Sequence, residues 1–346
     1  MRHNDMEQAI KARLARIIDE AHFTGASASV AWRGGEAHAG VGDLDPDRMF
    51  FAASATKLCV TALMLRGVAR GLWQLDDPAV RHGLDLRGLA VWRGEDLGAS
   101  VTLRDLMAHT SGIPDYMQAT AGQGVLADLA AGRDRTFGYD DMIGIARGIG
   151  AVARPGDRRR AHYSDTNYQL LGRLIAQGFG ADFADLCRDQ LFAPLGMSAS
   201  YIYTNPDDRR PVALRSGPRA VDLPLAMASV GADGGMVMTT QDGLRFVQGF
   251  FGGALFDPGA LAALQDWRPM FFPLQYGTGL MRFSMPWLLA GFRQIPPMIG
   301  HSGVNGTILF AVPDQGFYIA ASVNQIARRS TVYRLAMDLW AMQASR

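Results

Sequence analysis

The chain has little cysteine and no long apolar run, and both limit what it can be. Only Cys59 and Cys187 occur among 346 residues. Two cysteines are too few for a disulfide framework, so we expect buried free thiols. No segment approaches the ~20 consecutive apolar residues of a membrane span. Residues 1–20 alternate charged and apolar side chains and lack the apolar core of a secretory signal, which predicts a cytoplasmic chain without membrane contact.

An excess of charge of one sign is also missing. Lys and Arg total 34 and Asp and Glu total 33, a balance that argues against nucleic acid or an anionic membrane as the main partner. Nucleotide-binding glycine loops, zinc motifs and the Gly-x-Ser-x-Gly turn of α/β-hydrolases are absent. Asp43, Asp45 and Asp47 are spaced as in a calcium loop, but Arg48 stands where such a loop requires glycine. We therefore expect no cofactor and no metal.

Ser54 and Lys57 form a Ser-x-x-Lys motif that opens an apolar stretch, residues 58–65. Residues three apart share one face of a helix, so the lysine amine is expected beside the serine hydroxyl. A serine needs such a base to act as a nucleophile, and burial favours the neutral lysine that can accept a proton. Alone, the motif equally fits a helix N-cap serine followed by a lysine in the first turn.

Three further segments favour the catalytic interpretation. They are Tyr163-Ser164-Asp165, His301-Ser302-Gly303 and residues 106–116, which contain His109-Thr110-Ser111-Gly112. In this order after Ser54 and Lys57, they resemble the serine β-lactamase and penicillin-binding-protein superfamily. The most similar branch holds the class C β-lactamases, the D-alanyl-D-alanine carboxypeptidases and related esterases. Residues 192–197 and 232–240 resemble framework segments of the same family.

The resemblance implies an α+β fold of the β-lactamase type, an antiparallel sheet flanked by helices with a mainly helical inserted region. The sequence pattern agrees, because residues 27–33 and 36–41 predict a hairpin and residues 307–312 and 317–323 a second strand pair. Strands from both chain ends must pair, which leaves the helical middle of the chain as an insertion. The resemblance then implies a discontinuous sheet lobe and a helical lobe, with the active site between them. The sheet lobe comprises residues 1–75 and 226–346, and the helical lobe residues 76–225. Helices are expected at residues 1–20, 102–109, 165–178, 182–191 and 329–342.

The family implies a role for each motif residue. Ser54 is the nucleophile, and Lys57 and Tyr163 share the work of the base, with the choice between them open. A tyrosine close to an ammonium group is expected to be partly ionised. The backbone N–H groups of Ser54 and Val304 form the oxyanion hole. The substrate-binding residues are Asp165, His301, Ser302 and Gly303. His109 is expected to be structural.

Two residues depart from the family pattern. Asp165 stands where the Tyr-x-Asn motif has asparagine, and an ionised carboxylate cannot donate a hydrogen bond to a substrate carbonyl. It would also favour the charged form of Lys57, and its alternative role is to pair with Lys57 and order the site. His301 replaces the usual lysine, and a neutral imidazole holds a substrate carboxylate less firmly than an ammonium does. Both changes favour simple esters over β-lactams.

These observations predict a serine hydrolase that cleaves an ester or amide through an acyl-enzyme, with carboxylesterase or D-peptidase-like activity. Two alternatives remain open. One is acyl transfer to a small-molecule acceptor, and the other is a ligand-binding homologue that turns over slowly or not at all. The expected partner is a small-molecule ester, amide or peptide substrate. The sequence leaves its acyl and leaving groups and the oligomeric state undetermined.

Overall fold

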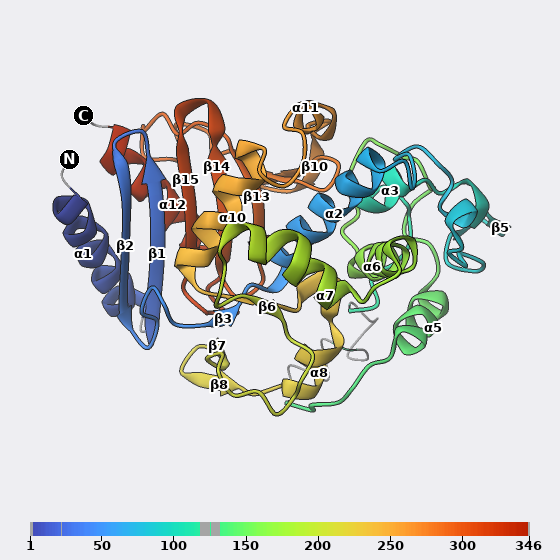
Figure 1. Cartoon of the computed structure of the whole chain (residues 1–346), viewed down its shortest axis with the longest axis horizontal. Coiled ribbons are helices and arrows are strands. Elements are labelled where there is room, and N and C mark those ends of the chain that lie inside the picture. Colours follow the sequence, from blue (N-terminus) through green and yellow to red (C-terminus); the bar gives the residue numbers. More distant parts are fainter. Residues whose placement is uncertain (1–2, 22, 118–124, 126–131, 345–346) are drawn as a thin grey trace.

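An eight-stranded antiparallel sheet joins the two ends of the chain (Figure 1). The computed structural model describes residues 3–21, 23–117, 125 and 132–344. The strand order is β10-β11-β12-β13-β14-β15-β1-β2, so β15, from the C-terminal part of the chain, pairs with β1. These strands are β1 (Gly25–Trp32), β2 (Gly35–Gly42), β10 (Arg268–Phe271), β11 (Leu274–Tyr276), β12 (Met281–Phe283), β13 (Met298–Gly303), β14 (Thr307–Val312) and β15 (Phe317–Ser322).

Helices cover this sheet and form most of the other side of the molecule, which also carries a small sheet of β3, β9 and β6. The helices are α1 (His3–Ala21), α2 (Lys57–Ala69), α3 (Leu103–Met107), α5 (Tyr139–Ile149), α6 (Asp165–Phe179), α7 (Phe183–Cys187), α8 (Pro224–Ser229), α9 (Gly231–Gly234), α10 (Thr240–Gly252), α11 (Ala260–Leu264) and α12 (Thr331–Ala344). The remaining strands are β3 (Phe50–Phe51), β4 (Val91–Trp92), β5 (Glu95–Asp96), β6 (Tyr201–Ile202), β7 (Leu214–Ser216), β8 (Arg219–Val221) and β9 (Met236–Met238).

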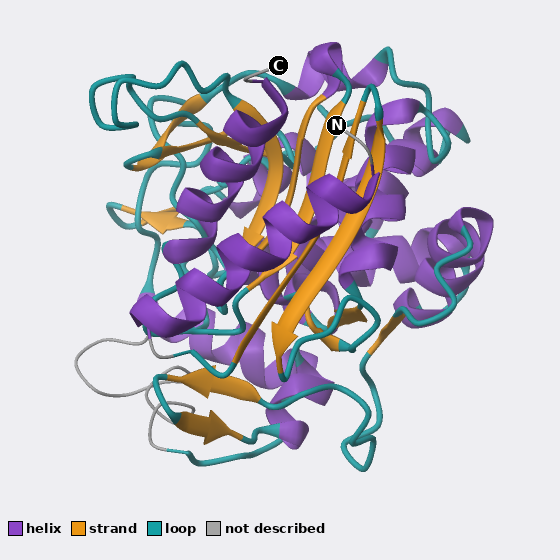
Figure 2. Ribbon diagram, turned by 90° about the vertical axis from the view of Figure 1, so that its left-hand side faces the viewer, coloured by secondary structure: helices purple, strands orange, loops and turns teal. Residues whose placement is uncertain are grey.

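Alternate residues of β1 show which helices cover each face of the large sheet. Ala28 and Val30 lie in the apolar core that the sheet shares with α1 and α12, the helices that lie across the sheet in Figure 2. The hydroxyls of Ser27 and Ser29 bond to the Thr240 hydroxyl of α10 at 2.9 and 3.0 Å. Because successive side chains of a strand point to opposite faces, α10 covers the face opposite α1 and α12. Both faces of the sheet are therefore buried.

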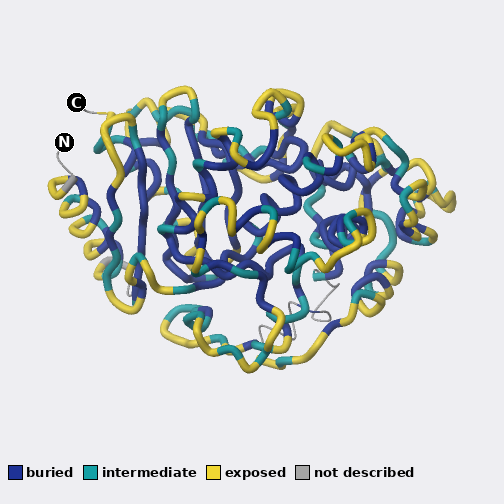
Figure 3. Tube along the Cα trace, viewed as in Figure 1, coloured by how far each residue is buried: buried dark blue, intermediate teal, exposed yellow. Residues whose placement is uncertain are grey.

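Helix α2 lies between the sheet and the helical side of the molecule. Its residues from Lys57 to Leu65 are all buried, as expected of a helix that is apolar nearly all round. It contacts α6 and α9 as well as β13, and Figure 3 shows buried chain running from the sheet into the helices. The N-terminal end of this helix carries the Ser-x-x-Lys motif, so the motif lies where sheet and helices meet.

The predicted fold class is confirmed, and so are many of its elements. The hairpin of β1 and β2 and the strands β14 and β15 follow the predicted ranges closely. Both cysteines are buried free thiols. The short strands β10–β12 were not predicted, and the helix expected over 182–191 is α7 followed by a wider π-helical turn, Arg188–Phe192. In the described part of the chain, no helix combines the length and apolarity needed to cross a membrane.

A tryptophan between two helices provides a test of the packing. Trp73 is buried, its indole N–H donates to the carbonyl of Met64 at 3.0 Å, and it lies against the backbone of α2 at Gly67. A Cβ atom on Gly67 would lie 2.0 Å from Trp73 Cζ2, whereas one on Gly144 of α5 would meet nothing within 4 Å. Alanine therefore fits at position 144 and clashes at position 67.

We predict opposite effects for the two substitutions. Gly144→Ala should raise the free energy of unfolding by about 0.5–1 kcal/mol, because alanine is the better helix former. Gly67→Ala should lower it by about 1–3 kcal/mol, because overpacking outweighs that gain. Chemical denaturation of both variants measures the difference, and an equally stable Gly67→Ala protein would contradict the packing described.

Candidate active site

Ser54 lies in a short turn of 3₁₀-helix, Ala53–Thr56, directly before α2. Two hydrogen bonds tie this turn to β9. The N–H of Ala52 donates to the carbonyl of Met236 at 2.7 Å, and the N–H of Met236 donates to the Thr56 hydroxyl at 2.9 Å. Ala53 has a φ of 48°, a left-handed conformation that is strained for a residue with a side chain. The sharp turn thus holds Ser54 at the start of the buried helix.

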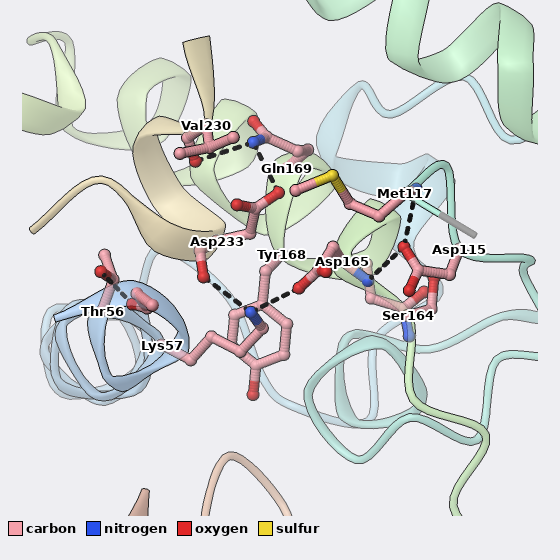
Figure 4. Close-up of polar contacts among 12 residues, drawn as sticks. Thr56, Lys57, Asp115, Met117, Ser164, Asp165, Tyr168, Gln169, Val230 and Asp233 are labelled. Atoms are coloured by element: carbon pink, nitrogen blue, oxygen red, sulfur yellow. Dashed lines mark hydrogen bonds and ion pairs between the residues drawn. The ribbon is translucent and has the colours of Figure 1, made fainter. Parts of the chain in front are cut away.

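Lys57 is fully buried and its ammonium group bridges two parts of the chain (Figure 4). Its Nζ atom donates to Asp165 Oδ1 at 2.6 Å and to the backbone carbonyl of Asp233 at 2.7 Å. The rings of Tyr163 and Tyr168 lie 5.1 and 5.2 Å from Nζ, measured to their centroids, within the range of cation–π attraction. The carboxylate compensates the cost of burying the ammonium group.

Tyr163 is half-buried and lines the same cavity as Ser54. Burial raises the pKa of Tyr163 well above its usual value, and the negative charge of Asp165 raises it further, while the nearby Ser54 side chain opposes the shift. The resting side chain is therefore a neutral phenol. The partly ionised tyrosine expected from the sequence is wrong for this site, because burial and Asp165 outweigh the attraction of a nearby ammonium.

The segment around His109 holds the Tyr163-Ser164-Asp165 motif in place through hydrogen bonds and ring packing. His109 Nδ1 accepts the N–H of Ser164 at 3.1 Å, and the His109 ring lies 4.4 Å from the Tyr163 ring. Asp115 Oδ1 accepts the N–H of Asp165 at 3.2 Å. Burial, followed by the charge of Lys57, lowers the pKa of His109 well below its usual value. A neutral imidazole with Nδ1 as acceptor acts as a support, in line with the structural role expected for it.

Asp115 and Asp233 were missed as site residues, although both lie in segments that the sequence singled out. Asp233 Oδ2 accepts hydrogen bonds from the hydroxyl of Tyr116 at 2.7 Å and from Gln169 Nε2 at 2.9 Å. Burial, followed by the charge of Asp165, raises the pKa of Asp233 to about 7. The same two causes raise the pKa of Asp115 well above its usual value. The only sequence signal was an aspartate inside each of two family framework segments.

His301 lies in β13 and is completely buried. Its Nδ1 contacts the carbonyl of Ser302 at 2.9 Å, and its Nε2 contacts the hydroxyl of Tyr276 at 3.0 Å. Burial, followed by the charge of Lys57, lowers the pKa of His301 to about 3. The imidazole is therefore neutral, and protein groups occupy both of its nitrogens. Its neighbours Ser302, Gly303 and Val304 line the adjacent cavity, whereas His301 does not.

The end of β13 packs directly against the turn that carries Ser54. A Cβ atom on Gly303 would lie 2.5 Å from the carbonyl oxygen of Ala52 and 3.1 Å from Ala53 Cβ. Only glycine permits this approach. The two backbone segments that carry the N–H groups of Ser54 and Val304 are thereby brought together, which is the arrangement that an oxyanion hole requires.

A cavity of about 1130 Å³ opens beside Ser54. Tyr163, Asp165, Ser302, Gly303 and Val304 share its wall with Ser54, as do Asp115 and Asp233. The structure thus brings most of the sequence-predicted site residues to one cavity, with Lys57 buried behind Ser54. Among the described residues, no group of His, Cys, Asp and Glu side chains has an arrangement that could hold a metal ion.

Comparisons with known proteins identify the family and the fold. The family model described as Beta-lactamase matches residues 6–335. Penicillin-binding protein 4 of Amycolatopsis lactamdurans is 27% identical over 349 residues, covering 90% of this chain and 84% of that protein. A D-stereospecific amidohydrolase from Streptomyces sp. shares the fold with a TM-score of 0.81, 21% identity and 99% of each chain covered. EstCE1, described as a hydrolase with promiscuous acyltransferase activity, shares it with a TM-score of 0.73, 19% identity and 97% of each chain covered.

The contacts of Ser54, Lys57 and Tyr163 predict that the lysine and the tyrosine act as one proton-transfer unit. Lys57→Ala and Tyr163→Phe should each lower kcat/KM for an ester by about 10²–10⁴-fold. The double variant should lose little more than the worse single variant, because residues that act together give non-additive losses. Steady-state kinetics of the four proteins tests this, and strictly multiplicative losses would exclude a shared role.

Proposed function

The chain belongs to the β-lactamase family of serine hydrolases, and we propose that it cleaves an ester or amide through an acyl-enzyme on Ser54, with carboxylesterase or D-peptidase-like activity. The observation that carries this proposal is that Ser54 and Tyr163 share the wall of the cavity, with the buried Lys57 amine 5.1 Å from the centre of the Tyr163 ring. A serine beside a tyrosine hydroxyl and a buried amine has the parts that covalent catalysis needs.

The resting contacts indicate how the serine proton leaves. Lys57 cannot take a proton while its ammonium donates to Asp165, and Tyr163 is a phenol. If Lys57 passes a proton to Asp165 across their 2.6 Å contact, the ion pair becomes a neutral pair with no change in total charge. The amine can then receive the Ser54 proton, directly or through the Tyr163 hydroxyl, as Ser54 Oγ bonds to the substrate carbonyl carbon.

The same groups complete the reaction. The N–H groups of Ser54 and Val304 stabilise the oxyanion, and the proton taken from Ser54 passes to the departing alcohol or amine as its bond breaks. Water then attacks the acyl-enzyme, loses a proton to the same base, and releases the acid while Ser54 regains its proton. A small-molecule alcohol in place of water would give acyl transfer. The large cavity leaves room for such an acceptor, and EstCE1 is described as having this activity.

Two features favour esters over β-lactams as substrates. Asp165 presents acceptor oxygens where a substrate carbonyl needs a donor. His301 has both nitrogens bonded to protein groups and does not line the cavity, so it offers no charge to a lactam carboxylate. Esters are also the more reactive acyl donors and need less assistance from the site.

A panel of p-nitrophenyl esters, D-amino-acid amides and nitrocefin tests the proposal, with Ser54→Ala as the control. We expect the esters to give the highest kcat/KM, nitrocefin the lowest, and Ser54→Ala to lose roughly 10⁴–10⁶-fold on every substrate cleaved. Ester cleavage that persists in Ser54→Ala would show that Ser54 is not the nucleophile. A kcat/KM for nitrocefin above those of the esters would reverse the proposed specificity.

Asp165→Asn restores the asparagine of the family motif and tests what the aspartate at this position does. The amide keeps an oxygen that accepts from Lys57 and adds an N–H donor for a substrate carbonyl. We expect the ratio of amide to ester cleavage to rise about twofold to tenfold, the equivalent of one hydrogen bond. Asp314→Asn, an exposed aspartate far along the chain, serves as the matched control and should leave the ratio unchanged. An equal fall in both rates, with the ratio unchanged, would mean that Asp165 does not set the choice between amide and ester and acts only by ordering the site or taking the Lys57 proton.

A further inference from the structure

The cavity beside Ser54 is much larger than a reacting ester group needs. Its volume of about 1130 Å³ exceeds the range of about 300–1,000 Å³ that is usual for small-molecule sites. Most of the side chains that line it are apolar. Six of them are methionines from separate parts of the chain: Met117, Met227, Met270, Met281, Met285 and Met337.

The polar side chains of the lining include two sets. One set surrounds the nucleophile and consists of Ser54, Tyr163, Asp165, Ser302 and the backbone beside them. The other set consists of Arg160, Arg219, Arg329 and Arg334, whose residues are exposed at the protein surface. The rest of the wall consists largely of methionine, leucine, phenylalanine and valine. A polar substrate part placed there would lose its hydrogen bonds to water without replacement.

The apolar lining also continues to the outside of the molecule. Phe271 and Phe272, at the turn between β10 and β11, line the cavity and are 50% and 70% exposed. Met285 also lines it, and the chain that follows exposes Trp287 by 60% and Phe292 by 70%. The Arg293 guanidinium holds this segment to Asp338 of α12 at 2.7 Å, next to the lining residue Met337. An apolar group that outgrows the cavity therefore finds further apolar surface at its edge.

We infer that the substrate carries a large apolar group, a medium or long alkyl chain or a fused-ring body, on one side of the ester or amide bond. This inference rests on the proposed function and adds the class of substrate. Methionine side chains are flexible and adapt to ligands of irregular shape. The cavity wall therefore favours large apolar groups in general over groups of one particular shape. Binding energy from this group, remote from the reacting bond, holds the carbonyl against Ser54.

Chain-length profiles test the inference. The acyl side is varied with p-nitrophenyl acetate, butyrate, hexanoate, octanoate and decanoate, and the alcohol side with the corresponding alkyl acetates, all below their micelle concentrations. We expect kcat/KM to rise with length in at least one series, by up to about fourfold per methylene. Profiles that are flat or fall in both series would overturn the inference.

Two lining residues and a matched control connect the profile to the cavity. Met227→Gln and Met285→Gln place an amide of similar size in the wall and should flatten the rise with chain length. Met342→Gln changes another half-buried methionine that does not line the cavity, and its profile should follow the unmodified protein. A rise that persists unchanged in both lining variants would place the apolar group elsewhere and also overturn the inference.

The failure of this inference is distinct from failure of the proposed function. If no ester or amide of any length is cleaved in a Ser54-dependent way, the proposed function itself is wrong. If short esters are cleaved by Ser54 and added length brings no gain, the hydrolase proposal stands and only the substrate class is rejected.

Discussion

The buried ion pair between Lys57 and Asp165 is the interaction on which the rest of the site depends. It joins the first residue of α2 to the first residue of α6, and the second bond of the ammonium reaches the carbonyl of Asp233 in α9. These helices carry Ser54, Tyr163 and part of the cavity wall on or next to their ends. Removing one partner of a buried pair commonly costs about 3–5 kcal/mol. The pair therefore fixes the position of the reacting groups as well as their charge.

The charges around this pair are unbalanced, and the imbalance explains the protonation states of its neighbours. Asp165 pairs with the Lys57 ammonium group, and Asp115 and Asp233 add two further buried carboxyl groups near Asp165. Burial and the charge of Asp165 raise the pKa values of the other two carboxyl groups, with that of Asp233 at about 7. Burial and the charge of Asp165 also raise the pKa of Tyr163, whose side chain stays a neutral phenol. These shifts favour the protonated forms of Asp115, Asp233 and Tyr163 beside the ion pair. Such an arrangement is suited to moving a proton without creating an unpaired buried charge.

Much of this arrangement could be predicted from the sequence, because the informative motifs are local. Ser54 with Lys57 and the hairpin of β1 and β2 depend on spacing and turn residues within a few positions. What could not be predicted depends on contacts between distant segments. The bond from Lys57 to the carbonyl of Asp233 leaves no signature, since every residue has a carbonyl. The burial of His301 behind the cavity follows from its register in β13, where a change of one residue would reverse its direction.

The size of the cavity was equally hidden from the sequence. Its methionines and phenylalanines have the pattern of ordinary core residues, and only the folded chain shows that residues of β10–β12, α8 and α12 line one space. The short length of these strands, three or four residues each, gives too little alternation for a pattern to be recognised. Apolar side chains around a void and around a packed core are the same in sequence.

Covalent labelling of Ser54 tests the central claim most directly. A fluorophosphonate probe bonds to a serine only when the hydroxyl is activated, and mass spectrometry of the digested protein locates the adduct. We predict an adduct on the peptide that contains Ser54, none in Ser54→Ala, and labelling slower by about 10²–10⁴-fold in Lys57→Ala. An adduct that persists in Ser54→Ala, or equal labelling rates with and without the Lys57 amine, would contradict the account of a serine activated by the buried lysine.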